Sequence, residues 1–286
     1  MTQQQVAEGI LSRQAYSKIE RNISEPSIDI FVDLLERLNY TLSDYMNEKN
    51  NLSEENYFHG LFLKGLDGSL STVDANKLYN YVNSNKTKNN IQLHLFGRVL
   101  SHLHPKYPSV IPKLSQSDKQ LFANYILNLD NHYSLNDLHI IGDFATIVLS
   151  YEQSIALYEH FPDFPTTNFA YDISSYQLQI CKIYSNFSDL FLSKKDTTRA
   201  SDSNQKLLAF LKQKMNLRYA FYQKINQITL DYIETGNEKI LNELLDIAKI
   251  MESIGDTETA KAIDYQYKAY LNNTTYLPED GLTPDK

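Results

Sequence analysis

Turn-forming and sulfur-bearing residues are scarce in this 286-residue chain, which has nine glycines, eight prolines, one cysteine and no tryptophan. So few turn residues disfavour a sheet protein, because consecutive strands need a turn between them. The single cysteine, Cys181, excludes an intrachain disulfide framework and a zinc site built from cysteines. Its apolar neighbours at helical spacing indicate a small buried side chain, with a reactive thiol or a disulfide across a dimer as the alternative.

Signals for secretion, membrane insertion and catalysis are also missing. No apolar run approaches the roughly 18 residues of a membrane helix, and no basic segment followed by an apolar one opens the chain. We therefore expect a cytoplasmic protein without membrane contact. The seven histidines lack metal-binding spacing, and neither a glycine-rich phosphate loop nor a Gly-x-Ser-x-Gly turn occurs. The sequence thus predicts no enzyme, no metal site and no cofactor.

Length and charge indicate the domain organisation. The chain carries a formal net charge of −8, and 42% of its residues are hydrophobic. A chain of this length usually folds as two domains. Its acidity excludes nucleic-acid binding over the whole surface, but it allows a small DNA-reading module on a larger acidic body. We predict one domain over residues 1–50 and a second over residues 51–286.

Residues 1–48 have the pattern of four short helices. Thr2 and Gln5 form a capping box for the first helix, and Ser12 caps a second helix over 13–21 after a short turn. A third helix follows Pro26 and Ser27, and a fourth begins at Thr41 or Ser43. The side chains expected to face inward are Tyr16 and Ile19 in the second helix and Ile28, Phe31, Leu34, Leu35 and Leu38 in the third. This spacing predicts a helix-turn-helix.

The segments 2–8, 11–13 and 16–21 resemble the helix-turn-helix of the lambda-repressor/Cro-like (XRE) superfamily, and the Rgg/GadR/MutR branch in particular. Members of that branch have another, basic helix before the Thr-Gln motif, whereas this sequence begins at Met1, so the first helix is expected to be missing. Residues 1–48 accordingly hold 4 basic and 8 acidic residues. A gene start assigned too far downstream, a trimmed chain and weakened DNA binding all remain open as explanations.

The resemblance implies that the second helix enters the major groove of a pseudo-palindromic double-stranded DNA site. Arg13 and Gln14 have long side chains that can recognise guanine and adenine edges through paired hydrogen bonds. Gln3 and the start of its helix could hold a phosphate. The candidate DNA contacts are Gln3, Ser12, Arg13, Gln14, Ser17 and Lys18. For each of these residues, the alternative is a solvated polar side chain on a helix surface.

From about Leu52 onward, apolar residues recur at helical spacing. The expected helices cover 54–66, 71–85, 89–104, 116–129, 134–150, 151–161, 167–193, 201–214, 216–235, 238–254 and 257–272. Gly236 and Gly255 lie 19 residues apart, and each separates two helices in a similar way. Helices of this length in pairs are typical of tetratricopeptide-like repeats. We predict an all-α protein in which the helix-turn-helix precedes a right-handed superhelix of helical hairpins.

The segments 134–144 and 228–271 are also similar to Rgg-type regulators of the RRNPP group. The resemblance implies a homodimer that binds a short signalling peptide in the concave groove of its repeats. An extended peptide has unpaired backbone groups, which Asn and Gln can satisfy, and Tyr can line pockets for its apolar side chains. The candidate contacts are Gln179 and Asn186, seven residues apart on one helix, and Tyr222 and Asn226, four apart on another. Alternatively, these side chains face solvent or cap neighbouring turns.

A second class of function remains open. A helical-repeat scaffold, or a response-regulator phosphatase of that architecture, would bind peptides or proteins without binding DNA. The motif at 12–21 disfavours this alternative, because a helical bundle has no need for the short turn or for the polar tip at Arg13 and Gln14. Because the first helix is expected to be missing, this alternative remains open.

Overall fold

The computed structural model describes residues 1–42, 44–46, 54–130, 133–162 and 173–272. Every regular element within these ranges is a helix, which confirms the predicted all-α class. The chain forms two compact units, Met1–Asp74 and Ala75–Lys286. The predicted boundary at residue 50 lies outside the described residues. None of the described helices is long and apolar enough to cross a membrane.

The first unit contains α1 (Gln3–Ala7), α2 (Arg13–Glu20), α3 (Ile28–Arg37) and α5 (Glu54–Leu66). Its helices begin where the sequence predicts, because local hydrogen bonds satisfy the free N–H groups of each first turn. Thr2 and Gln5 form the capping box of α1, and the hydroxyls of Ser12 and Ser27 cap α2 and α3. Between α1 and α2, Gly9 has a φ of 77°, a left-handed conformation that glycine adopts without strain. The short turn of the helix-turn-helix depends on it.

A small apolar core joins α1, α2 and α3. Its buried members are Val6, Ala7, Tyr16 and Leu34, against which Ile10, Leu11, Ile19 and Ile30 pack. The predicted apolar stripe of α3 is only partly right, because Ile28 is 64% exposed and Leu38 is 45% exposed. Ile30 lies four residues before Leu34 and shares its helix face, whereas Ile28 lies six before it and points elsewhere.

The remaining helices follow the predicted ranges closely, and residues 167–172 of the helix predicted over 167–193 lie outside the described residues. They are α6 (Thr72–Asn85), α7 (Asn90–Leu103), α8 (Gln116–Leu127), α9 (Leu135–Val148), α10 (Tyr151–His160), α11 (Ile173–Ser193), α12 (Thr197–Gln213), α13 (Leu217–Thr235), α14 (Glu238–Leu241), α15 (Glu243–Ser253) and α16 (Thr257–Leu271). Two predictions were wrong. The helix predicted from residue 201 begins at Thr197, because the Asp196 side chain caps it. The single helix predicted over 238–254 is two helices that meet at Asn242.

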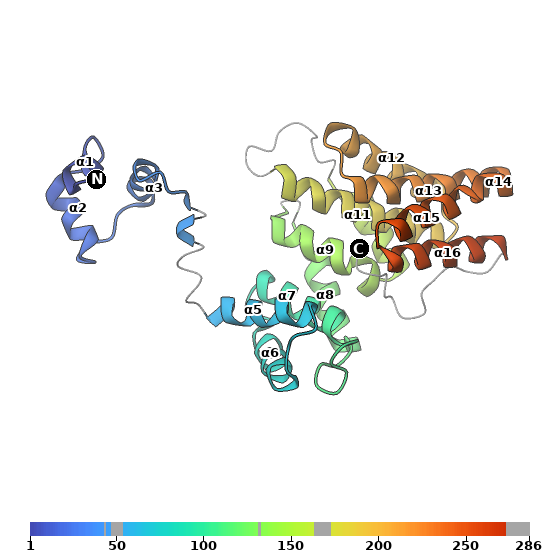
Figure 1. Ribbon diagram of the computed structural model, residues 1–286, viewed down its shortest axis with the longest axis horizontal. Helices are drawn as coiled ribbons and strands as arrows, with labels where there is room; N and C mark the ends of the chain where they lie inside the picture. The colour runs from blue at the N-terminus through green and yellow to red at the C-terminus, as the bar shows by residue number, and fades with distance from the viewer. Residues whose placement is uncertain (43, 47–53, 131–132, 163–172, 273–286) are drawn as a thin grey trace. The chain divides into compact units, whose positions relative to one another are not determined.

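Most helices of the second unit pack in two layers; Figure 1 labels them along the chain. In the first layer α9 packs between α7 and α11, α11 packs against α13, and α13 packs against α15. In the second layer α8 packs on α9, α12 packs on both α11 and α13, and α16 packs on α15. Gly236 ends α13 in the left-handed conformation, as the sequence predicts. Stacked helical hairpins are thus the building units of this domain.

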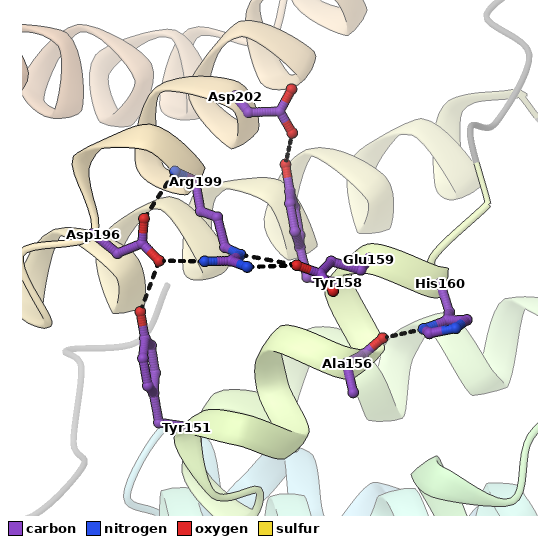
Figure 2. Close-up of polar contacts among 8 residues, drawn as sticks. All are labelled: Tyr151, Ala156, Tyr158, Glu159, His160, Asp196, Arg199 and Asp202. Carbon is purple, nitrogen blue, oxygen red and sulfur yellow. Dashed lines mark hydrogen bonds and ion pairs between the residues drawn. The ribbon is translucent and has the colours of Figure 1, made fainter.

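Polar contacts hold α10 against α12 in the second layer (Figure 2). Tyr151 donates to Asp196 at 3.0 Å, and Arg199 bridges Asp196 at 2.8 Å and Glu159 at 2.5 Å. The hydroxyl of the buried Tyr158 donates to Asp202. The ring of Tyr158 also packs edge-on against Phe187 and Phe191 of α11. A short helix is thereby fixed to both of its longer neighbours.

Candidate nucleic-acid interface and ligand-binding face

The predicted reading helix α2 presents its polar side chains to solvent. Ser12 accepts a hydrogen bond from the backbone N–H of Ala15 at 3.2 Å, and this bond starts the helix. Arg13, Gln14 and Lys18 are exposed, and their side chains make no hydrogen bond or ion pair within the described residues. Tyr16 lies on the opposite side in the core, and Ser17 is half-buried between the two sides. Three long polar side chains are therefore available on one capped helix.

Gln3 has a partner inside the protein. Its amide Nε2 donates to Glu20 Oε2 at 2.5 Å, which links the start of α1 to the end of α2. A second bond, from Arg37 of α3 to the backbone carbonyl of Gln5 at 3.0 Å, links α3 to α1. These bonds set the angle between the helices of the motif, so a phosphate contact by Gln3 would compete with its bond to Glu20.

Three neighbouring helices of the first layer each carry one stripe of partly accessible side chains. The stripe residues recur three or four positions apart, which places them on one side of their helix. They are Ile91, His94, Arg98 and Ser101 on α7, Asn136, His139, Asp143 and Thr146 on α9, and Leu178, Lys182, Asn186 and Asp189 on α11. We refer to these twelve residues as the open face.

Hydrogen bonds join the three stripes into one surface. His94 Nε2 lies 2.6 Å from Asp143 Oδ2, and Lys182 Nζ bonds the other oxygen of the same carboxylate. Asn186 donates to the backbone carbonyl of Gly142 at 2.7 Å. Although burial opposes ionisation of Asp143, the bonds from His94 and Lys182 hold the pKa of its carboxyl well below the usual range. The centre of the open face is therefore an ionised carboxylate with two basic neighbours.

His139 lies beside this cluster, with its ring centroid 5.2 Å from that of His94. Neither ring nitrogen of His139 has a hydrogen-bond partner in the described part of the chain. Burial lowers the pKa of His139 to about 4, and electrostatic interactions with His94, Lys182 and Arg98 act in the same direction, against the opposing effect of Asp143. Its imidazole is thus neutral near physiological pH.

The four predicted peptide contacts occupy different environments. Asn186 lies on the open face. Gln179, predicted to share its surface, is only 6% exposed, because its side chain lies against Gly142 of α9. Tyr222 and Asn226 are 9% and 1% exposed. Gln179 Oε1 and Asn226 Nδ2 are nevertheless buried without a hydrogen-bond partner, which is a costly state for polar atoms.

Sequence reasoning missed the cluster of His94, His139, Asp143 and Lys182. Asp143 is 49 residues from His94 and 39 from Lys182, so no local pattern connects them. The only local signal was the spacing of four between His139 and Asp143, which indicates a shared helix face. No group of three or more potential metal ligands occurs within the described ranges.

Comparison with known proteins identifies the N-terminal motif. Residues 1–56 match the helix-turn-helix family HTH_3, so the chain carries a helix-turn-helix domain. No curated protein matches the chain.

Solved structures match almost the whole chain. A protein of Listeria monocytogenes EGD-e described as a transcriptional regulator is 18% identical, with a TM-score of 0.67 over 96% of this chain and 93% of its own. PrgX in complex with cCF10 is 14% identical, with a TM-score of 0.69 over 98% of this chain and 90% of its own. The SHP pheromone receptor Rgg2 of Streptococcus dysgalactiae is 14% identical, with a TM-score of 0.66 over 94% of each chain. The chain shares its fold with these proteins.

Proposed function

We propose that this chain, whose first 56 residues match the helix-turn-helix family, is a sequence-specific DNA-binding regulator of transcription. The observation that carries the proposal is the set of free side chains of Arg13, Gln14 and Lys18 on the capped helix α2. Long side chains with several donors can reach base edges in the major groove. We propose that the protein acts in the cytoplasm. The role is binding, and we propose no enzymatic step.

The DNA proposal is tested by selecting bound sequences from random duplexes and then measuring affinity on the selected site. Arg13→Ala should weaken binding to that site by about 1–3 kcal/mol and relax the base preference at one position in each half-site. Arg21→Ala is the matched control, because it removes the same charge from the other end of α2. We expect the control variant to bind all DNA sequences more weakly by the same factor. If Arg13→Ala selects the same site with unchanged affinity, α2 is not the reading helix.

We further propose that the protein binds a pseudo-palindromic site as a homodimer, since a two-fold site calls for a two-fold protein. An apolar groove of about 370 Å³ between α13 and α15 supports this. Its lining includes Leu217 and Ile250, which are 71% and 46% exposed, and Lys224 and Glu243 at its rim supply both signs of charge. A patch of this kind can be complementary to itself across a two-fold axis.

Sedimentation at micromolar concentration tests the dimer. The wild-type chain should sediment as a dimer and Leu217→Glu as a monomer, because an unpaired carboxylate would be buried at the interface. Leu127→Glu, on α8, makes the same change at a residue that is 41% exposed and should leave the dimer intact. A monomeric wild-type chain would contradict the proposal.

For the second unit we propose that a short signalling peptide binds at the open face, with residues 1–50 reading DNA and residues 51–286 sensing peptide and dimerising. PrgX was solved with cCF10, and Rgg2 is described as a pheromone receptor. The physical support is Asn186, which is partly accessible on the open face and whose amide nitrogen donates to the carbonyl of Gly142. Its amide oxygen could accept a hydrogen bond from a backbone N–H of an extended peptide.

Calorimetry with synthetic peptides encoded by small reading frames beside the gene tests peptide binding. Asn186→Ala should weaken binding several-fold, because the peptide group it pairs with would be left unsatisfied. Asn124→Ala, on the second-layer helix α8, should bind like the wild type. Wild-type affinity in Asn186→Ala would exclude Asn186 from the site. The alternative, a peptide-binding scaffold or phosphatase without DNA binding, is favoured if peptide binds but no DNA sequence is selected.

A further inference from the structure

His139 is an accessible histidine on the open face without a hydrogen-bond partner for either ring nitrogen. It is surrounded by charged groups from every first-layer helix around it. His94 and Arg98 belong to α7, Asp143 to its own helix and Lys182 to α11. On the other side of α9, helix α8 packs through apolar rings such as Phe122 against Phe144. Any polar partner for His139 must therefore approach from the open face.

Basic groups outnumber acidic ones among the charges that act on His139. Besides burial, interactions with His94, Lys182 and Arg98 lower its pKa, whereas the carboxylate of Asp143, which bonds His94 and Lys182, raises it. This contrasts with the net charge of −8 of the whole chain. A partly buried positive site of this kind attracts an anionic group, and the surrounding low dielectric strengthens that attraction.

We propose that His139 and Lys182 form a subsite for a carboxylate of the bound peptide, either its C-terminal carboxylate or an acidic side chain, and that binding places a proton on His139. This inference rests on the proposed peptide-binding function. A carboxylate within hydrogen-bond distance of an imidazole favours its protonated form. His139 is neutral in the free protein, so carboxylate binding must take up a proton from solution.

Three pools of N-acetylated octapeptides test the subsite. All are random mixtures of Leu, Val, Ile and Gly. The first ends in a free carboxylate, the second in a carboxamide, and the third in a carboxamide with one internal Glu. Each pool is passed over the immobilised full-length chain at neutral pH, and retained peptides are quantified by mass spectrometry. We expect the wild type to retain at least one carboxylate pool on the order of tenfold better than the uncharged pool.

His139→Gln should remove most of this preference, since Gln can donate a hydrogen bond but cannot take up a proton. The matched control is His160→Gln at the exposed end of α10 in the second layer, which should keep the preference. Which carboxylate pool is retained identifies the source of the anionic group. Calorimetry of the best-retained peptide in phosphate and in Tris then measures proton uptake, which we expect in the wild type and in His160→Gln but not in His139→Gln.

The outcomes separate this inference from the proposed function. Equal retention of charged and uncharged pools overturns the carboxylate subsite and leaves peptide binding in place. Retention of no pool by the wild type overturns both. A carboxylate preference that persists unchanged in His139→Gln, or wild-type binding without proton uptake, overturns the role of His139.

Discussion

Gly97, buried in α7, allows two phenylalanine rings to meet beside the helix backbone. A Cβ atom at this position would lie 2.4 Å from Cζ of Phe144 and 2.6 Å from Cζ of Phe122. The two rings are themselves buried, with 1% and 0% exposure, and their centroids are 4.5 Å apart. Neither ring can move without displacing its neighbours in a close-packed core.

Two opposing effects decide the stability of Gly97→Ala. Replacing a helical glycine by alanine stabilises a helix by about 0.5–1 kcal/mol. Overpacking a core by one methyl group costs about 1–3 kcal/mol, and the anchored rings place this site in the upper half of that range. We therefore expect Gly97→Ala to lower the free energy of unfolding by about 1–2 kcal/mol, the opposite of what helix propensity alone predicts.

Gly142→Ala is a matched control within the same unit. Its Cβ would meet its nearest neighbour, Cδ of Lys182, at 3.4 Å, an ordinary van der Waals contact. The helix effect should then dominate and stabilise the protein by about 0.5 kcal/mol. Urea unfolding followed by circular dichroism measures both variants, with midpoints compared at equal slope. If Gly97→Ala unfolds at or above the wild-type midpoint, the packing argument for this helix is wrong.

Three further predictions concern buried groups. Burial alone would raise the pKa of Asp137, but hydrogen bonds to its carboxylate lower that pKa in the folded protein. The carboxylate therefore stabilises the fold above the unfolded pKa of about 4, and this stabilisation is lost as pH falls through the lower folded pKa. The urea midpoints of Asp137→Asn and the wild type should converge in acid, and a difference that stays constant with pH would contradict this. Burial raises the pKa of the Cys181 thiol to about 12, so a thiol reagent should label it only after unfolding, and rapid labelling of the native chain would show an accessible thiolate. Tyr158→Phe removes the hydrogen bond to Asp202 and should lower the free energy of unfolding in urea by about 0.5–1.5 kcal/mol. Tyr57→Phe, at a residue that is 53% exposed, should change it little, and equal effects of the two substitutions would argue against the hydrogen bond.

Helix positions were predictable because their signals are local. The capping boxes at Ser134 and Ser150 place the starts of α9 and α10 within a residue of the predicted ones. The start of α12 was predicted wrongly, because its capping residue follows a turn rather than a capping box. Asp196 caps α12 after Lys195, which has a positive φ of 60°, and the apolar pattern contained no sign of that turn.

The candidate ligand site was less predictable, because it depends on helix rotation and on pairing between distant segments. Gln179 and Asn186 share a nominal face, yet only Asn186 is accessible, because Gly142 on the neighbouring helix leaves space that Gln179 occupies. The ion cluster around Asp143 needs three helices in register, and their order in the layer is a tertiary property. On α2, by contrast, the exposure of Arg13 and Gln14 followed from one short helix and its cap.

Asp143 also determines how binding at the open face can change the protein. It is the shared partner of His94 on α7 and Lys182 on α11, so it contributes to two helix–helix contacts at once. A ligand carboxylate at Lys182 competes with Asp143 for that ammonium group, and a proton on His139 adds a positive charge beside His94. Both changes shift the balance of bonds between α9 and its neighbours. A ligand alters an equilibrium only by its differential affinity for the two arrangements, typically about 1–3 kcal/mol. If Lys182 exchanges Asp143 for a ligand carboxylate, the contact between α9 and α11 loses one hydrogen bond to a charged group, which is worth about 1.5–3 kcal/mol. This magnitude is sufficient to shift the equilibrium between two arrangements of these helices.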